Sequence, residues 1–133
     1  MKFGIFYEHQ LPRPWTEESE YRLLQDSLDE IELADRLGYD YAWEVEHHFL
    51  EEYSHSSAPE VFLAAAAART ERIRLGHGIR HTPPAYNPPA RTAEVVSTLD
   101  LISHGRIEFG IGEGATRLEL GGFGTTLRSG NLK

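Results

Sequence analysis

A strand–helix unit that recurs along the chain restricts its fold more than any other feature. The segments RIRLGHG (72–78) and RIEFGIG (106–112) share an arginine, an isoleucine, a large apolar residue and two glycines at matching positions, 34 residues apart. A third apolar segment, YDYAWEV (39–45), begins about the same distance before the first. Units of this period with parallel strands build either a doubly wound sheet or a barrel of eight units. The repeat therefore predicts an α/β fold.

Apolar runs and helix-ending residues predict the elements inside each unit. We expect parallel strands, neighbouring in sequence order, at residues 2–7, 39–45, 72–79 and 106–112. Helices are expected between them, over residues 21–37, 61–70 and 87–104. Gly38 and Gly105 are expected to end the first and third helices, and a capping box of Ser57 and Glu60 to open the second. Asn87 should open the third.

Composition excludes several classes of protein. Of the 133 residues, 40% are hydrophobic and 26% charged, as in globular domains, and the net charge of −8 argues against binding to nucleic acid or anionic membranes. The absence of cysteine excludes disulfides, thiolate metal sites and cysteine nucleophiles. The apolar runs are too short for a signal peptide or a bilayer span, so we expect a cytoplasmic protein.

Most of the histidines gather where parallel α/β folds place their chemistry. The segment YAWEVEHHFL (41–50) begins apolar and ends by presenting acids and histidines together. Six histidines fall at or beyond the C-terminal ends of the first three expected strands: His9, His47, His48, His55, His77 and His81. Since active sites of such folds lie at that rim, we expect the site there.

Two short motifs suggest other chemistries for this chain. GIGEGA (110–115) fits the dinucleotide fingerprint, but a glycine-rich stretch follows where a helix and a distant acid are required. Glu44, Glu46 and His48 alternate, so a continued strand would place them on one face as metal ligands. Metal sites in barrels need ligands from several strands, and adjacent histidines point to opposite sides, so no metal is expected. Glycines and aromatic residues at the strand ends suit a planar cofactor ring instead.

Several segments together resemble the N-terminal half of the bacterial luciferase-like monooxygenases, which are flavin-dependent (β/α)8 barrels. The matching pieces, in the order and spacing of the family, are MKFGIFYEHQ, ADRLGYDYAWEVEHHF, RIRLGHGI, HTPPAYNPPARTAEVVSTLDLISHGR, RIEFGIGEG and GGFGT. The resemblance covers about residues 1–126. It implies that this stretch is a partial (β/α)8 TIM-barrel domain, and we expect residues 127–133 to be an unstructured tail.

The resemblance also implies roles for individual residues. His47 matches the histidine that donates or accepts protons beside the flavin while the reduced cofactor reacts with oxygen, and Glu46 would orient the strand end or the substrate. Gly78 and Ile79 match the strand end that often carries a cis peptide bond beneath the flavin ring. Gly112 stands where luciferases have a cysteine near the flavin, which puts only light emission in doubt.

Glu113 stands where luciferases have a basic residue near the flavin phosphate, which a carboxylate would repel. The implied reaction uses FMN, reduced by a separate flavin reductase, and O2 to oxygenate a small organic substrate. A deazaflavin (F420)-dependent oxidoreductase of the same fold is the alternative, as is a non-catalytic remnant or partner-binding half. A complete barrel needs eight strands and about 250 residues. We therefore expect a truncated chain that self-associates through its exposed sheet edges.

Overall fold

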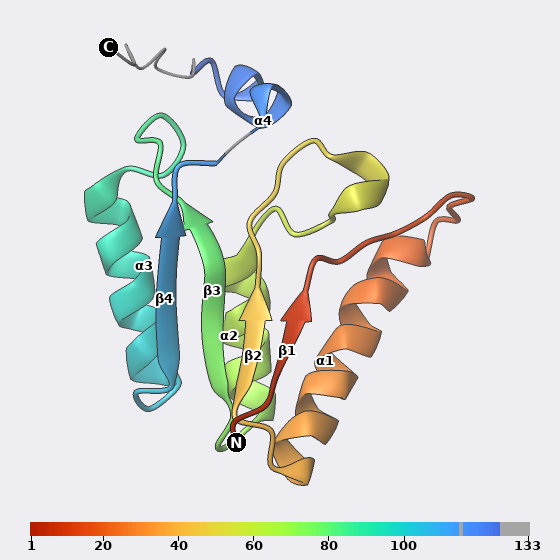
Figure 1. Ribbon diagram of the computed structural model, residues 1–133, viewed down its shortest axis with the longest axis vertical. Coiled ribbons are helices and arrows are strands. Elements are labelled where there is room, and N and C mark those ends of the chain that lie inside the picture. The colour runs from red at the N-terminus through yellow and green to blue at the C-terminus, as the bar shows by residue number, and fades with distance from the viewer. Residues whose placement is uncertain (115, 126–133) are drawn as a thin grey trace.

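A parallel four-stranded sheet forms the centre of the molecule (Figure 1). The structure, a computed structural model, describes residues 1–114 and 116–125. The strands lie in the order β1-β2-β3-β4, and every neighbouring pair is parallel. Their bounds are β1 Gly4–Tyr7, β2 Tyr41–Glu44, β3 Arg74–His81 and β4 Ile107–Gly112. The predicted strands and their order are confirmed.

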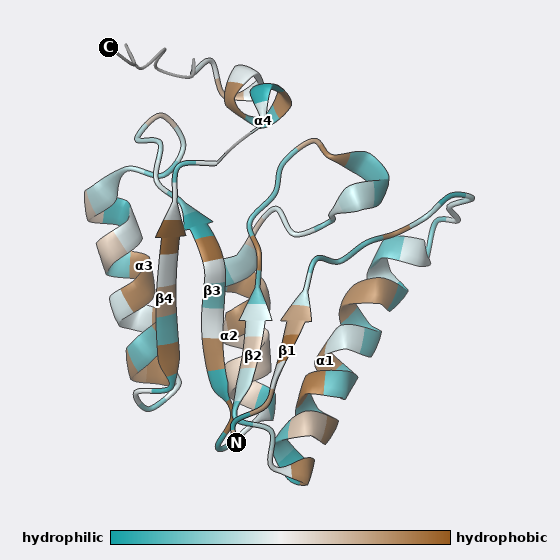
Figure 2. Ribbon diagram, in the orientation of Figure 1, coloured by the Kyte–Doolittle hydropathy of each residue, from teal (hydrophilic) through white to brown (hydrophobic). Residues whose placement is uncertain are grey.

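Helices connect the strands and cover the sheet. Their bounds are α1 Ser19–Leu37, α2 Pro59–Arg69, α3 Pro89–Ile102 and α4 Arg117–Gly122, with a 3-10 turn at Glu51–Tyr53. In Figure 1, α2 lies behind the sheet with α1 and α3 on either side of it, and α2 contacts both. Hydrophobic and hydrophilic residues alternate along α1 (Figure 2), as expected of a helix that buries one face. None of the described helices is long and apolar enough to cross a membrane.

The hydrophobic core lies between the sheet and its helices. Ile31 of α1, Leu63 of α2 and Leu75 of β3 are completely buried in it. The opposite face of the sheet carries aromatic side chains, and Phe6 there remains 55% exposed. Gly76 permits the packing of that face, because a Cβ at this position would lie 2.3 Å from the Trp43 ring.

Two buried charged residues fix the end of the sheet opposite the expected site. The Asp35 carboxylate accepts hydrogen bonds from the backbone N–H groups of residues 71, 72 and 73. Burial raises the pKa of Asp35, but these hydrogen bonds outweigh it and hold the pKa below its usual value. The Arg106 guanidinium donates to the carbonyls of Ala67, Thr70, Ile73 and Ser103. These bonds set where β3 and β4 begin.

The predicted glycine at the end of α1 is confirmed, whereas two predicted N-caps are wrong. Gly38 caps α1 in the left-handed conformation, with φ of 85°. The N-caps of α2 and α3 are Ala58 and Pro88, and neither uses a side-chain bond. The polar side chains expected there, Glu60 and Asn87, instead bind the guanidinium of Arg80, a distant partner that local pattern does not reveal.

The third helix ends earlier than predicted, and a further helix was not foreseen. Helix α3 ends at Ile102, and Gly105 adopts a left-handed conformation, φ 78°, in the turn that follows. Helix α4 forms over residues expected to be irregular because of their many glycines. The predicted tail, 127–133, lies outside the described residues.

Candidate active site

A cavity of about 400 Å³ opens at the C-terminal ends of the strands. Its walls are formed by Phe6, Glu8, Val45, Glu46, His47, Gly78, Ile79, His81, Glu113 and Gly114. Five of the six predicted site residues are therefore brought together. The sixth, Gly112, lies directly behind Ile79, because a Cβ on it would come within 2.6 Å of the Ile79 Cδ1 atom.

Glu44 is separated from this cavity. Strand β2 ends at Glu44, and its carboxylate turns to the helix-covered side, where Oε1 lies 2.8 Å from Nδ1 of His9. The Ser56 hydroxyl also donates to it, and burial raises the pKa of Glu44. The alternating set of Glu44, Glu46 and His48 therefore does not share a face, because the strand does not continue.

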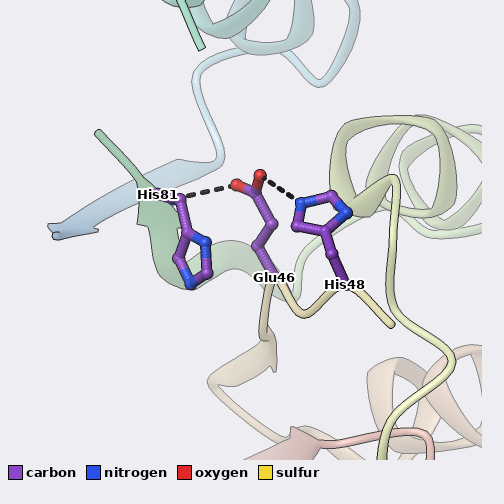
Figure 3. A group of neighbouring side chains, drawn as sticks. All are labelled: Glu46, His48 and His81. Atoms are coloured by element: carbon purple, nitrogen blue, oxygen red, sulfur yellow. Dashed lines mark hydrogen bonds and ion pairs between the residues drawn. The ribbon is translucent and has the colours of Figure 1, made fainter. Parts of the chain in front are cut away.

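Glu46 is the centre of a hydrogen-bond network that joins β2 to β3. Its carboxylate accepts from the backbone N–H of His81 at 2.8 Å and lies 2.9 Å from Nε2 of His48 (Figure 3). It also accepts from the Asn87 amide at 2.7 Å. Burial raises the pKa of Glu46, but the bonds from His48, His81 and Asn87 outweigh it and lower the pKa overall. Glu46 is thus an ionised, buried anchor of the strand ends.

His47 is held between two carboxylates. Its Nδ1 atom lies 2.8 Å from Oε1 of Glu119, and its Nε2 atom lies 3.6 Å from Oε2 of Glu8, a residue of the cavity wall. The Tyr53 ring packs edge-on against the imidazole at 5.4 Å. The side chain remains 22% exposed, so the imidazole is oriented and still accessible from the cavity.

Glu119 is the principal site residue that sequence reasoning missed. It is buried in α4 and also accepts from the backbone N–H of His48 at 3.0 Å. Burial raises the pKa of Glu119, but hydrogen bonds from Thr116, His47 and the His48 backbone outweigh it and lower the pKa overall. A signal was present: Thr116 and Glu119 form a T-x-x-E pattern, and the Thr116 hydroxyl caps α4 by accepting from the Glu119 N–H.

Aromatic contacts attach α4 to the loop after β3. Phe123 stacks on Tyr86 at 4.2 Å between ring centroids and packs edge-on against His48. The Tyr86 hydroxyl lies 2.9 Å from Nδ1 of His81, and burial raises the pKa of Tyr86 to about 12. Burial also lowers the pKa of His81, so its imidazole is neutral near pH 7.

Three of the six histidines predicted at the rim do not face the cavity. His77 lies inside β3 with its ring against Phe109, and burial lowers its pKa to about 4. His9 faces Glu44 and Phe62 on the helix side, and His55 pairs with Glu20 of α1. A position at a strand end places a residue at that end of the sheet, but it does not determine on which side of the sheet the side chain lies. Of the six histidines, His47, His48 and His81 belong to the site.

The lining of the cavity combines apolar side chains with carboxylates. Phe6, Val45, Gly78 and Ile79 supply apolar wall, and the bond between Gly78 and Ile79 is cis, as the resemblance implies. A Cβ on Gly78 would come within 3.2 Å of the Phe6 ring and narrow this space. No lysine or arginine is among the described residues that line the cavity, whereas Glu113 is.

Comparison with known proteins decides the family. A family model described as luciferase-like monooxygenase matches residues 1–130. The chain belongs to the luciferase-like monooxygenase family. Among curated luciferase-like relatives, limonene 1,2-monooxygenase of Rhodococcus erythropolis is 39% identical over 115 residues, which cover 84% of this chain and 27% of that protein.

Solved structures of luciferase-like enzymes share the fold. Monooxygenase RslO1 from Streptomyces bottropensis superposes with a TM-score of 0.83 at 37% identity, covering 96% of this chain and 37% of its own. The oxygenating constituent of 3,6-diketocamphane monooxygenase from Pseudomonas putida, in complex with FMN, superposes with a TM-score of 0.81 at 26% identity. The match covers 93% of this chain and 32% of that one. An F420-dependent secondary alcohol dehydrogenase, at 22% identity and a TM-score of 0.65 over 85% of this chain and 32% of its own, shares the fold alone. The chain thus spans about a third of the length of these proteins.

Proposed function

We propose that this chain carries the flavin-facing part of a monooxygenase that uses reduced FMN and O2 to oxygenate a small organic molecule. The observation that supports this proposal best is the orientation of His47, which Glu119 holds by a hydrogen bond and which faces a cavity with apolar walls. Family membership supports the reaction class. Reduced flavin supplies the electrons that activate oxygen, and the protein must bind its ring and move protons beside it.

His47 is the proton-handling residue of this proposal. Since Glu119 is ionised, its carboxylate accepts a hydrogen bond from Nδ1–H of His47. This leaves Nε2, on the side of the cavity, as the atom that takes up or releases a proton. Glu119 also stabilises the imidazolium that forms when Nε2 is protonated. The Glu46 carboxylate bonds to His48, His81 and Asn87, and so holds the strand end from which His47 projects.

The cofactor would rest its ring on the Gly78–Ile79 backbone, with Phe6 and Val45 completing the apolar wall. Its phosphate requires cationic or backbone donors from elsewhere in a barrel, because Glu8 and Glu113 make this rim negative. FMN is favoured over F420 because the diketocamphane enzyme binds FMN and is more similar in sequence than the F420 enzyme. That enzyme is an oxygenating constituent, which supports a separate flavin reductase as the partner here.

The uncovered sheet suggests that a complete site needs more than one copy of these four strands. Phe6 on the open face and Ile111 on the edge strand β4 are 55% and 60% exposed. Exposed strand edges pair with other chains. We therefore propose self-association through the exposed edges of the sheet. A non-catalytic partner-binding half is the competing function, and it predicts no flavin binding.

Equilibrium titration of the purified chain with FMN and with F420, followed by flavin fluorescence, tests the proposal. We expect saturable binding of FMN, weakened in a Gly78→Val variant whose side chain would enter the cavity. Stronger binding of F420 would favour the alternative oxidoreductase. Binding of neither cofactor, at any oligomeric state seen by sedimentation, would support the non-catalytic half.

A further inference from the structure

Glu46, His48 and His81 form a compact set of potential metal ligands (Figure 3). One ligand atom from each lies within 4.8 Å of the others, and Oε1 of Glu46 and Nε2 of His48 are 2.9 Å apart. Ligands bound at about 2.0–2.2 Å from a Zn²⁺ ion are themselves roughly 3–3.5 Å apart. The side chains therefore need only small adjustments to surround a cation.

The three ligands come from two strand ends. Glu46 and His48 follow β2, and His81 ends β3. A metal was not expected from the sequence because ligands from one segment do not make a site, and because His47 and His48 point in different directions. The structure resolves both objections: His81 supplies the second strand, and His47 turns away to Glu119.

The charges around the cluster favour a dication. The guanidinium of Arg80 is 2.8 Å from the Glu60 carboxylate, so these two charges balance each other. The carboxylates of Glu46 and Glu119 are both buried. A divalent cation bound by Glu46 would compensate the negative charge of its buried carboxylate.

Supporting hydrogen bonds already orient the ligands as metal sites require. The Asn87 amide and the His81 N–H donate to the two oxygens of Glu46. The Tyr86 hydroxyl engages Nδ1 of His81, which leaves Nε2 as the free nitrogen. Such partners fix the ring orientation and raise the metal affinity of histidine and carboxylate ligands.

We propose that Glu46, His48 and His81 bind a divalent transition-metal ion of the Zn²⁺ class. Two histidines and one carboxylate, with a remaining position for water, are a ligand set typical of Zn²⁺. The ion would lie beside the flavin cavity, tie β2 to β3, and be independent of the proposed oxygenation. Metal binding at this site does not require bound flavin.

Titration of the flavin-free chain with Co²⁺ tests the site. Co²⁺ can substitute for Zn²⁺, and it absorbs visible light when its coordination number is low. We expect one equivalent of Co²⁺ to give saturable visible bands that one equivalent of Zn²⁺ abolishes. His48→Phe keeps an aromatic ring beside Phe123 and removes a ligand, and Glu46→Gln keeps an acceptor for the His81 N–H. Each should lower the affinity by at least about 100-fold.

Two further variants separate this site from its neighbours. His104→Asn changes an exposed histidine at a helix–strand corner and should leave the titration unchanged. Glu119→Gln should also retain the bands, because Glu119 belongs to a second group, with His47 and His81, that has a different carboxylate. Absence of saturable bands in the folded parent chain, bands unchanged in His48→Phe, or bands lost only in Glu119→Gln would each overturn the proposal. Circular dichroism of every variant establishes that it is folded.

Discussion

The Nδ1 atom of His47 lies 2.8 Å from Oε1 of Glu119, although the two residues are 72 positions apart in the chain. One residue follows β2 and the other lies in α4, beyond the last strand. The orientation of the proposed proton-handling histidine therefore depends on a short helix that the sheet itself does not include. Glu119 is a positioning residue, because it reaches the cavity only through His47.

His47→Ala should lower flavin-dependent oxygenation by roughly 10²–10⁴, the usual contribution of a general acid–base residue. The measurement is turnover with chemically reduced FMN, in whatever assembled state binds the cofactor. His55→Ala is the matched control, because His55 pairs with Glu20 away from the cavity. Equal turnover in the His47 variant and the parent would remove His47 from the mechanism.

The direct effect expected of Glu119→Gln is a change in the tautomer of His47. The amide can present its N–H to Nδ1, so Nε2 would carry the proton more often. Nitrogen-15 NMR of the imidazole reports this directly, and turnover should fall about ten-fold, less than in His47→Ala. Glu52→Gln, a change at an exposed glutamate, serves as control. A tautomer distribution identical to that of the parent would contradict the assigned hydrogen bond.

Asp35→Asn should destabilise the fold by about 2 kcal/mol near neutral pH, because one amide oxygen replaces a carboxylate that accepts three charge-assisted bonds. The folded pKa of Asp35 is depressed, so its stabilisation is complete above the unfolded pKa of about 3.9 and is lost as pH falls through the lower folded pKa. Urea unfolding at neutral and at acidic pH should show the difference shrinking. Asp26→Asn makes the same charge change on the exposed face of α1 and should show neither effect.

Gly76→Ala should destabilise the sheet by about 1–3 kcal/mol, since the new methyl group would overlap the Trp43 ring. A second substitution, Trp43→Leu, should recover part of that loss, and a double-mutant cycle by urea unfolding measures the coupling. Gly121→Ala has no neighbour within 4 Å of its Cβ and is the control. Purely additive effects of Gly76→Ala and Trp43→Leu would show that the two side chains do not collide.

Ile111→Lys should reduce self-association, because a charged side chain on an exposed edge strand opposes pairing with another strand. Sedimentation velocity over a range of concentrations measures the effect. Leu33→Lys places the same charge on an exposed position of α1 rather than on β4. If both substitutions reduce association equally, the interface does not involve the β4 edge.

The sheet could be predicted from the sequence because each strand is a short apolar run inside a repeated unit. Ala42 and Leu75 are buried in the sheet, as their place in apolar runs predicts. Capping residues were harder to predict. Asn87 has the chemistry of a cap, but Glu46 and Arg80 bind its amide more effectively, and those partners are 41 and 7 residues away.

The candidate site was only partly predictable for the same reason. Glu46 and His47 of the cavity wall directly follow β2, and Gly78 lies near the end of β3, so the lengths of these strands place them at the rim. Strand length does not determine on which side of the sheet a side chain lies. His77 is buried within β3, and the Glu44 side chain turns toward His9. Glu119 lies in a glycine-rich segment, and tertiary contacts such as the packing of Phe123 on Tyr86 and on His48 bring it to His47.

The position of α4 has a consequence for how the protein is made. A ribosome releases His47 well before Glu119, and the last strand, Ile107–Gly112, also emerges first. The sheet can therefore form while the imidazole of His47 is still free to rotate. During synthesis, the growing polypeptide can therefore form the four-stranded sheet first and orient His47 only after α4 has emerged.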